Sequence, residues 1–317
     1  MSVYTVVERH ELETFLTTYE VGALRNFSGI TAGIENTNYF VTTANGDYVL
    51  TLFEFTPATE LPFFLALMAH LAEHGVPSAH PVADRGGRFL TTLKGRPAAL
   101  VMRLPGASVA HPHRAHCRAI GQAMARMHLA SVDFNGQRHN DRGPAWRAEV
   151  ASMLAHCLRA EDRLLLAEAV EEFRGDRFAG LPSGVIHADL FRDNALFQAH
   201  QLTGLIDFYY AHRGPFIYDL AVAVADWCFD DDKQLLDAAL GGALLSAYHQ
   251  VRPLLSAERS AWTMALRAAG LRFWLSRLKD RHFPRDGALV HSKDPEPFKR
   301  VLLYARGAAA TLEKLLP

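Results

Sequence analysis

The chain has 317 residues, of which 49% are hydrophobic and 21% charged, enough for one large domain or two linked domains. The formal net charge of -1 at pH 7 indicates no basic surface for nucleic acid or an anionic membrane. Cys117, Cys157 and Cys228 form no closely spaced pair, which argues against a zinc knuckle or a disulfide framework. Residues 1–12 are charged, and no uncharged apolar run reaches the ~20 residues of a membrane helix, so we expect a cytoplasmic protein.

The sequence of residues 8–74 predicts a helix, then antiparallel strands, then a second helix. A short helix is expected at 8–21, followed over 25–53 by a strand, a glycine-containing turn and two antiparallel strands joined at Asn45–Gly46. Residues 60–74 predict a helix, because large apolar side chains recur there at helical spacing.

Two more strands are expected at 88–93 and 97–103, with a hairpin turn at Gly86–Gly87. Leu104, Pro105 and Gly106 break the pattern and predict a linker. We therefore divide the chain into an N-terminal lobe, 1–103, and a C-terminal lobe, 104–317, and the residues that assign nucleotide binding to the first and catalysis and substrate binding to the second follow below.

The C-terminal lobe is predicted to be mostly helical. Helices are expected at 112–129, 145–159 and 161–174, a short β region at 184–207, and nearly continuous helix from 217 to 316. The fold class is thus α+β, with a small antiparallel β-rich lobe that carries one main helix and a larger helical lobe. A cleft between two such lobes is a common ligand site.

Three histidines gather where the first helix of the second lobe is expected to start. His113 and His116 have a spacing that suits a metal site on a helix. His111 lies beside them, but Pro112 interrupts the run and no nearby carboxylate completes a ligand set. The sequence favours a polar helix start over metal binding here.

A polar motif stands in the β region between residues 184 and 207. His187, Asp189 and Asn194 have the HxDxxxxN spacing of a protein-kinase catalytic loop, and Asp207 with the following phenylalanine stands where the kinase metal-binding aspartate would be. Strand-like pieces between Asn194 and Asp207 predict a hairpin. Each residue alone would be a turn or core residue, but the four together predict phosphoryl transfer.

Phosphoryl transfer from ATP requires positioning, Mg²⁺ and a carboxylate that orients the attacking hydroxyl. Asp189 is predicted to act as this base, with His187 as the second catalytic candidate. Asn194 and Asp207 offer the oxygen ligands that Mg²⁺ prefers. Asp193 is interpreted as a turn residue.

The N-terminal lobe contains a weaker candidate for ATP binding. Ser28, Gly29, Thr31 and Gly33 fall between two strands, where backbone amides and hydroxyls can meet phosphate oxygens, although a plain β-turn is the alternative. Met102 is a further candidate for nucleotide binding. The chain contains no GxxxxGK[ST] sequence, so a P-loop is excluded.

The phosphate-binding lysine of standard kinases is missing from the expected strand. Thr51 stands at its position, and Lys94, the only lysine in the first hundred residues, falls in another strand or turn. Either ATP is held differently or an arginine such as Arg25 substitutes. Without that lysine, Glu60 has the simpler role of favouring a helix N-terminus.

At these residues the chain resembles the aminoglycoside phosphotransferase and choline kinase superfamily, which has a protein-kinase-like, two-lobed fold. Within it the chain looks like the homoserine kinases of the threonine pathway. The matching pieces span nearly the whole chain: residues 33–39, 48–54, 61–64, 75–77, 125–128, 187–207 and 218–220. The last piece contains Asp219, where the superfamily usually has a structural aspartate. The resemblance implies transfer of the ATP γ-phosphate to the side-chain hydroxyl of L-homoserine.

A zwitterionic amino acid needs a cation for its carboxylate and an acceptor for its ammonium. Asp226 is a candidate for the ammonium. Candidates for the carboxylate are Arg192, Arg213, Arg272 and Arg277, and the aromatic residues that could wall the pocket are Phe191, Tyr209, Tyr210, Trp227 and Trp274.

Two alternatives remain open at the level of the sequence. The acceptor could be choline, methylthioribose, an aminoglycoside or a sugar, although the basic stretch 252–300 argues mildly against a cationic aminoglycoside. The chain could also be an inactive kinase-like protein, which Thr51 favours and the intact set of Asp189, Asn194 and Asp207 opposes. The sequence does not define an oligomeric state.

Overall fold

The computed structural model describes residues 4–30, 36–230, 232–284 and 293–317, which divide into two compact units. The first unit contains the described residues up to Pro105 together with Gly204–Ile206. The second contains the described residues of Gly106–Thr203 and those that follow Ile206. The sequence predicts a boundary between residues 103 and 104, close to this main division.

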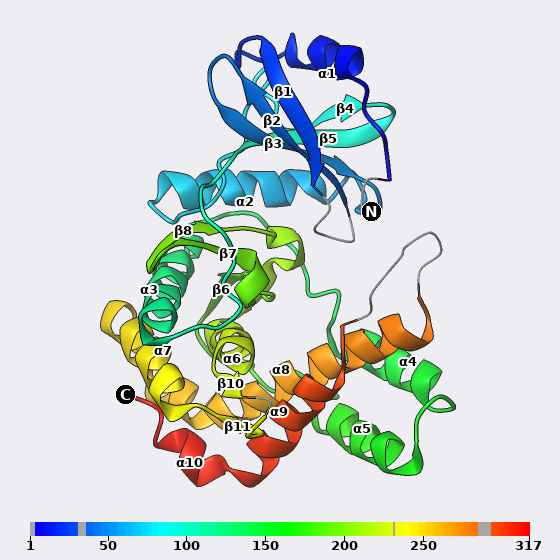
Figure 1. Cartoon of the computed structure of the whole chain (residues 1–317). Coiled ribbons are helices and arrows are strands. Elements are labelled where there is room, and N and C mark those ends of the chain that lie inside the picture. The colour runs from blue at the N-terminus through cyan, green and yellow to red at the C-terminus, as the bar shows by residue number, and fades with distance from the viewer. Residues whose placement is uncertain (1–3, 31–35, 231, 285–292) are drawn as a thin grey trace. The chain divides into compact units, whose positions relative to one another are not determined.

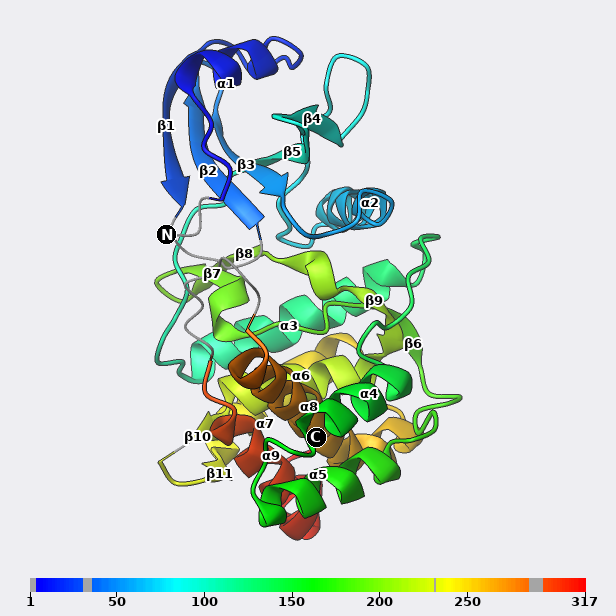
Figure 2. The same ribbon diagram turned by 90° about the vertical axis from the view of Figure 1, so that its right-hand side faces the viewer.

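The N-terminal unit is built on a five-stranded antiparallel sheet with the strand order β1-β2-β3-β5-β4 (Figure 1). Its two helices lie at opposite ends of the sheet in Figures 1 and 2. The elements are α1 (Arg9–Leu16), β1 (Leu24–Ile30), β2 (Asn36–Thr43), β3 (Asp47–Phe53), α2 (Leu61–Glu73), β4 (Thr91–Leu93) and β5 (Arg96–Met102). The predicted order of helices and strands is therefore confirmed in this unit.

One predicted turn in this unit is confirmed, and one predicted helix end is wrong. The hairpin before β5 turns at Lys94 and Gly95, whose φ angles of 52° and 73° suit a type I′ turn. The predicted turn at Gly86–Gly87 lies before β4: Gly87, with a φ of 80°, donates its N–H to the carbonyl of Asp84 at 2.9 Å, and the Asp84 N–H donates to the carbonyl of Arg88 at 2.8 Å. Helix α1 ends earlier than predicted, because the hydroxyl of Thr17 donates to a carbonyl of the last turn and competes with the helical pattern.

The C-terminal unit is mostly helical. In it α3 packs against α7, and the long helix α8 packs against α6 and α9 (Figure 1). Gly121 permits the close approach of α3 to α7, since a Cβ there would lie 2.2 Å from the carbonyl oxygen of Leu244. The helices are α3 (Arg114–Ser131), α4 (Pro144–Leu154), α5 (Ala160–Glu172), α6 (Phe216–Trp227), α7 (Ala238–Val251), α8 (Ser256–His282), α9 (Glu296–Gly307) and α10 (Ala309–Glu313).

Short strand pairs frame the polar motif. The predicted hairpin is present as β7 (Ala195–Gln198) and β8 (Gln201–Leu205). Strand β6 (Ser183–Ile186) pairs antiparallel with β9 (His212–Pro215). The sequence does not predict β9, because its four residues include glycine and proline and show no apolar alternation.

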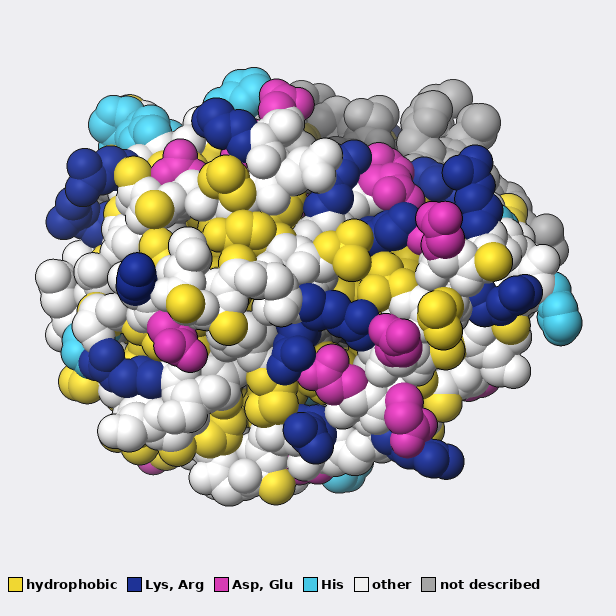
Figure 3. Space-filling view, turned by 90° about the horizontal axis from the view of Figure 1, so that it is seen from below, with side chains coloured by type: hydrophobic (Ala, Val, Ile, Leu, Met, Phe, Trp, Pro, Cys, Tyr) yellow, Lys and Arg dark blue, Asp and Glu magenta, His cyan; other side chains and the backbone are white. Residues whose placement is uncertain are grey.

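The surface agrees with the near-zero net charge. On the face drawn in Figure 3, basic and acidic side chains are interspersed. Ion pairs such as Arg306–Glu168, at 3.0 Å, and Arg267–Glu172, at 2.9 Å, connect neighbouring helices of the C-terminal unit. Among the described residues, every helix is too short or too polar to cross a lipid bilayer.

Candidate active site

The loop that follows β6 is held in place by a buried aspartate on α6. Asp219, which is 0% exposed, accepts the backbone N–H of His187 at 3.0 Å and that of Ala188 at 2.7 Å. Ala188 has a φ of 63°, a left-handed conformation that costs a residue with a side chain about 1–2 kcal/mol. The two charge-assisted hydrogen bonds offset this strain and fix the loop immediately before Asp189.

A buried chain of hydrogen bonds keeps Asp219 ionised. Burial raises the pKa of Asp219, but hydrogen bonds, first among them the one from His128 Nε2 at 2.9 Å, hold it below its usual value. Burial also lowers the pKa of His128, so its ring is neutral, and its Nδ1 accepts from the Tyr248 hydroxyl at 2.7 Å. Arg252 contacts the Tyr248 hydroxyl and Glu258, which extends the chain to α8.

Two further residues of α6 support the same loop. The indole of Trp227 donates to the carbonyl of Leu190 at 3.1 Å. Asp226 accepts both the backbone N–H of Arg192, at 2.8 Å, and its Nε, at 3.1 Å. Asp226 and Arg192, which the sequence suggests for the substrate ammonium and carboxylate, are thus paired with each other.

Asn194 and Asp189 are joined directly at the other end of the loop. The Asn194 amide nitrogen donates to the Asp189 backbone carbonyl at 2.8 Å and lies 3.3 Å from its Oδ2. Asp207 follows β8 in a left-handed conformation, with φ 64° and ψ 58°, and its side chain is exposed. The ring of His187 is buried against Phe208, with 4.6 Å between the ring centroids.

The pKa of the Asp189 carboxyl is raised well above its ordinary value. Burial raises its pKa most strongly, the positive charge of Arg272 opposes this, and the negative charge of Asp207 adds to it, which together bring the pKa to about 7. A general base works best when its pKa lies near the working pH. The environment of Asp189 therefore suits proton transfer at neutral pH.

A small pocket beside Ala188 carries several charged and aromatic side chains. They include Arg138, Asp141, Arg142, Tyr210, Tyr218 and Arg272. The Arg272 guanidinium lies over the rings of Phe273, at 3.8 Å, and Tyr210, at 5.0 Å, and the residue is only 6% exposed. Two of the sequence candidates, Arg272 and Tyr210, therefore line this pocket.

Three other candidates, Trp274, Arg277 and Arg213, do not line this pocket. Trp274 belongs to the core, being 1% exposed. The Arg277 guanidinium donates to the carbonyl of Asp294 at 2.7 Å, and that of Arg213 lies 3.4 Å from the carbonyl of Phe134. Arg138, Asp141 and Arg142 were not predicted, although their polar, turn-forming segment 138–144 between two helices is the sequence signal that could have indicated them.

The residues expected to bind the nucleotide lie in the N-terminal unit. Ser28 and Gly29 are exposed near the end of β1, while Thr31 and Gly33 lie outside the described residues. Met102 ends β5 and is 44% exposed, and its N–H donates to the carbonyl of His80 at 2.9 Å.

Thr51, at the position where standard kinases have a phosphate-binding lysine, makes a hydrogen bond within the sheet. Thr51 is 4% exposed, and its hydroxyl donates to Asn38 Oδ1 at 2.7 Å within the sheet. Lys94 forms an ion pair with Glu11 on α1, at 2.9 Å. Thr51 thus bridges neighbouring strands, and Lys94 fastens α1 to the sheet.

The antiparallel sheet of the N-terminal unit, the helical C-terminal unit and the loop from His187 to Asn194 together define the class of protein as a kinase-like phosphotransferase. A family model described as "Phosphotransferase enzyme family" matches residues 26–254, and the chain belongs to this family. It is 49% identical over 308 residues to a homoserine kinase of Methylobacillus flagellatus, covering 97% of this chain and 96% of that one. It is 48% identical over 316 residues to a homoserine kinase of Methylobacillus glycogenes, covering 100% and 98%.

Solved structures support the same architecture. A spectinomycin phosphotransferase in complex with ADP and spectinomycin superposes with a TM-score of 0.71 at 11% identity, covering 98% of this chain and 100% of that one. The predicted resemblance to homoserine kinases and the predicted protein-kinase-like α+β class are both confirmed. Membership of the family implies an enzyme that uses ATP and acts on a small molecule.

Proposed function

We propose that this enzyme transfers the γ-phosphoryl group of ATP to the side-chain hydroxyl of L-homoserine, giving O-phospho-L-homoserine and ADP. The observation that carries the proposal is the near-50% identity to homoserine kinases over almost the full length of both chains. The product serves threonine biosynthesis, and we expect the enzyme to act in the cytoplasm.

In this proposal Asp189 orients the homoserine hydroxyl and accepts its proton while the oxygen attacks the γ-phosphorus and ADP leaves. The raised pKa of its carboxyl, about 7, supports this role. His187 acts as a positioning residue, since its ring is buried and its backbone N–H is bound to Asp219.

We further propose that Asn194 and Asp207 hold Mg²⁺. Because the amide nitrogen of Asn194 donates to Asp189, the amide oxygen is turned away from that residue and is suited to a cation. Asp207 adds an exposed carboxylate at the end of β8. When bound, Mg²⁺ supplies positive charge that offsets the negative charge of the phosphates.

Arg272 is our candidate for the homoserine carboxylate. It lines the pocket beside Ala188, its charge acts on Asp189, and aromatic rings hold its guanidinium in a fixed plane. A planar, preoriented guanidinium can bind both oxygens of a carboxylate. Ser28, Gly29, Thr31, Gly33 and Met102 remain our candidates for nucleotide contacts.

A coupled assay of ADP release, run over homoserine, choline, methylthioribose and kanamycin, tests the proposal. We expect turnover with homoserine to exceed that with each of the other acceptors by a factor of at least about a hundred, because a site built for specific polar groups rejects analogues that lack them. A preference for another acceptor would replace the substrate, and ADP release with none of them would favour an inactive kinase-like protein.

A further inference from the structure

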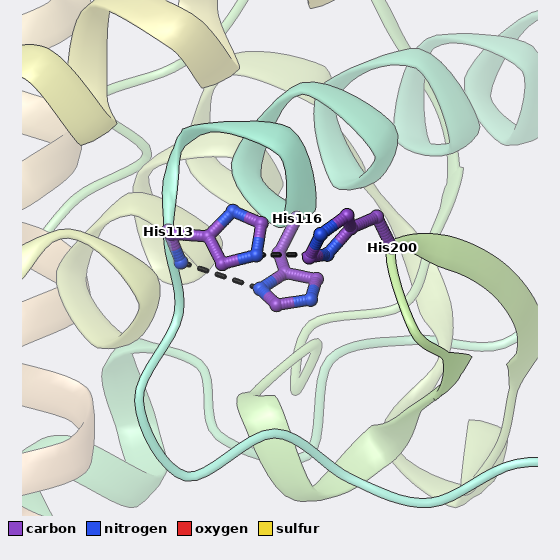
Figure 4. Close-up of side chains that lie close together, drawn as sticks. All are labelled: His113, His116 and His200. Atoms are coloured by element: carbon purple, nitrogen blue, oxygen red, sulfur yellow. Dashed lines mark hydrogen bonds between the residues drawn. The ribbon is translucent and has the colours of Figure 1, made fainter.

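A cluster of three histidines lies outside the phosphotransfer centre but within the same unit. His113 is the N-cap of α3, His116 is three residues further along the helix, and His200 lies in the turn between β7 and β8 (Figure 4). One ring nitrogen from each residue lies within 4.8 Å of those of the other two. The sequence predicts a polar helix start at His113 and His116, and the hairpin adds the third histidine.

The ring of His200 stands at a steep angle to the other two, while the rings of His113 and His116 overlap, with 3.8 Å between centroids and 34° between planes. The planes of His113 and His200 meet at 81° with 4.3 Å between centroids, and those of His116 and His200 meet at 65°. His113 Nε2 and His200 Nδ1 are 2.8 Å apart (Figure 4). Tetrahedral coordination at about 2.0–2.1 Å places ligand nitrogens about 3.3 Å apart, so a small opening of this pair would admit an ion.

The hydrogen bonds of His116 prepare one nitrogen for a metal. Its Nε2 lies 3.1 Å from the carbonyl oxygen of Ala199, an acceptor only, so Nε2 carries the proton and Nδ1 carries the lone pair. That lone pair now accepts the backbone N–H of His113 at a long 3.3 Å (Figure 4), a contact that a bound ion would replace. Metal-bound histidines characteristically donate their other N–H to such a carbonyl, which fixes the ring. His116 is 5% exposed, so its orientation is further fixed by packing.

His113 and His200 offer the remaining lone pairs. The Nδ1 of His113 accepts the Ala115 N–H, so in the neutral ring the proton lies on Nε2, which faces His200 Nδ1. Coordination through His113 Nε2 would move its proton to Nδ1, which now accepts the Ala115 N–H at a long 3.2 Å. Metal binding would replace two long hydrogen bonds, one to His113 Nδ1 and one to His116 Nδ1, together with the contact between His113 Nε2 and His200 Nδ1. The exposed His200 can adjust its position.

We propose that His113, His116 and His200 form a binding site for a divalent transition-metal ion, with Zn²⁺ as the first candidate. Three neutral imidazoles with a fourth position open to water are a known ligand set for Zn²⁺, and imidazole also suits Ni²⁺ and Cu²⁺. A hard ion such as Mg²⁺ prefers oxygen ligands and is not expected here.

The ion would join the start of α3 to the tip of the β7–β8 hairpin. Strand β7 begins immediately after Asn194, and β8 ends two residues before Asp207. The site would therefore restrain the hairpin that connects the two proposed Mg²⁺ ligands. Its occupancy is expected to raise the unfolding temperature, because an ion that binds only the folded state stabilises it.

The test is Zn²⁺ titration of metal-free full-length protein in excess Mg²⁺, with competition against a chromophoric chelator. We expect one tight site in the wild type, and in His200→Gln a loss of affinity larger than the roughly 10–100-fold that removal of an outer-shell partner costs. His200 is exposed, so this variant should fold normally, which circular dichroism checks. Co²⁺ should give tetrahedral visible bands in the wild type, and these bands should be absent in His200→Gln.

His10→Gln is the matched control, since it removes an exposed histidine from α1 and should leave Zn²⁺ affinity and the Co²⁺ bands unchanged. Equal Zn²⁺ affinity in the wild type and His200→Gln would overturn the proposal. So would a wild type that binds no Zn²⁺ in competition with the chelator. Because the readout is metal binding, neither result depends on which acceptor the enzyme phosphorylates.

Discussion

Replacing Asp189 by asparagine is expected to abolish catalysis and, at the same time, to stabilise the fold at neutral and alkaline pH. Asparagine keeps the shape of the side chain but cannot accept the proton of the acceptor hydroxyl, so turnover should fall by a factor of about a hundred or more. The affinity for ATP should change little, because Asp189 is proposed to contact the acceptor.

The gain in stability follows from the pKa of the carboxyl. In the folded protein this pKa is about 7, against an ordinary value of 3.8, a difference of about three pH units. Each unit corresponds to about 1.4 kcal/mol, which gives about 4 kcal/mol, and partial exposure of the side chain reduces the expected value to about 2–4 kcal/mol. Since the folded state favours the neutral acid, this contribution to stability is complete below pH 3.8 and is lost as the pH rises to about 7.

Urea unfolding of the wild type and Asp189→Asn from pH 5 to pH 8, with a chelator present, measures this difference. The variant should be more stable by about 1–1.5 kcal/mol at pH 5, which lies about one unit above 3.8, and by about 2–4 kcal/mol at pH 8. Asp133→Asn, which removes an exposed carboxylate, should stay within about 0.5 kcal/mol of the wild type. A difference between Asp189→Asn and wild type that does not grow with pH would refute the reasoning, and near-normal turnover would refute the role of Asp189 as base.

Three further substitutions test the rest of the site. Asp207→Ala should abolish Mg²⁺-dependent nucleotide binding in calorimetry, and unchanged affinity for Mg²⁺·ATP would contradict its role as a ligand. Arg272→Lys should raise KM for homoserine at least about tenfold, because a lysine cannot make the paired contacts of a guanidinium; an effect confined to KM for ATP would exclude the assignment. Asp219→Asn should cost about 3 kcal/mol in urea unfolding and reduce turnover, since it removes the charge that holds the N–H groups of His187 and Ala188. A variant as stable as the wild type would show that these hydrogen bonds contribute little.

The phosphotransfer motif was predictable because its information is local. The spacing from His187 to Asn194 is a property of one loop, and the flanking apolar pieces identify the hairpin that leads to Asp207. The turns of the N-terminal unit also follow from local sequence. Gly86 and Gly87 predict a turn from residue type alone, and Gly87 has a φ of 80°, whereas the turn at Lys94 and Gly95 was implied only by the predicted strands on either side of it.

The properties that make the loop reactive depend on residues far along the chain. The pKa of Asp189 is set by burial and by Arg272 on α8, and neither follows from residue types. The ion pair between Arg192 and Asp226 likewise could not be predicted from residue types, because the two residues are distant in sequence. Each residue alone was a reasonable candidate for a zwitterionic substrate, but together they satisfy one another and stabilise the loop.

The supports of that loop share one helix. Asp219, Asp226 and Trp227 are separated by seven and eight positions, so they lie on one face of α6, and each accepts from or donates to the backbone of the segment 187–192. The helix itself is almost entirely buried, which leaves these side chains little freedom to move. The loop residues between His187 and Asn194 are consequently held by a rigid element rather than by their own short turns. A substitution on this face of α6 should therefore reduce turnover without touching the substrate, and it should do so together with a loss of stability, whereas a substitution of Asp189 separates the two effects.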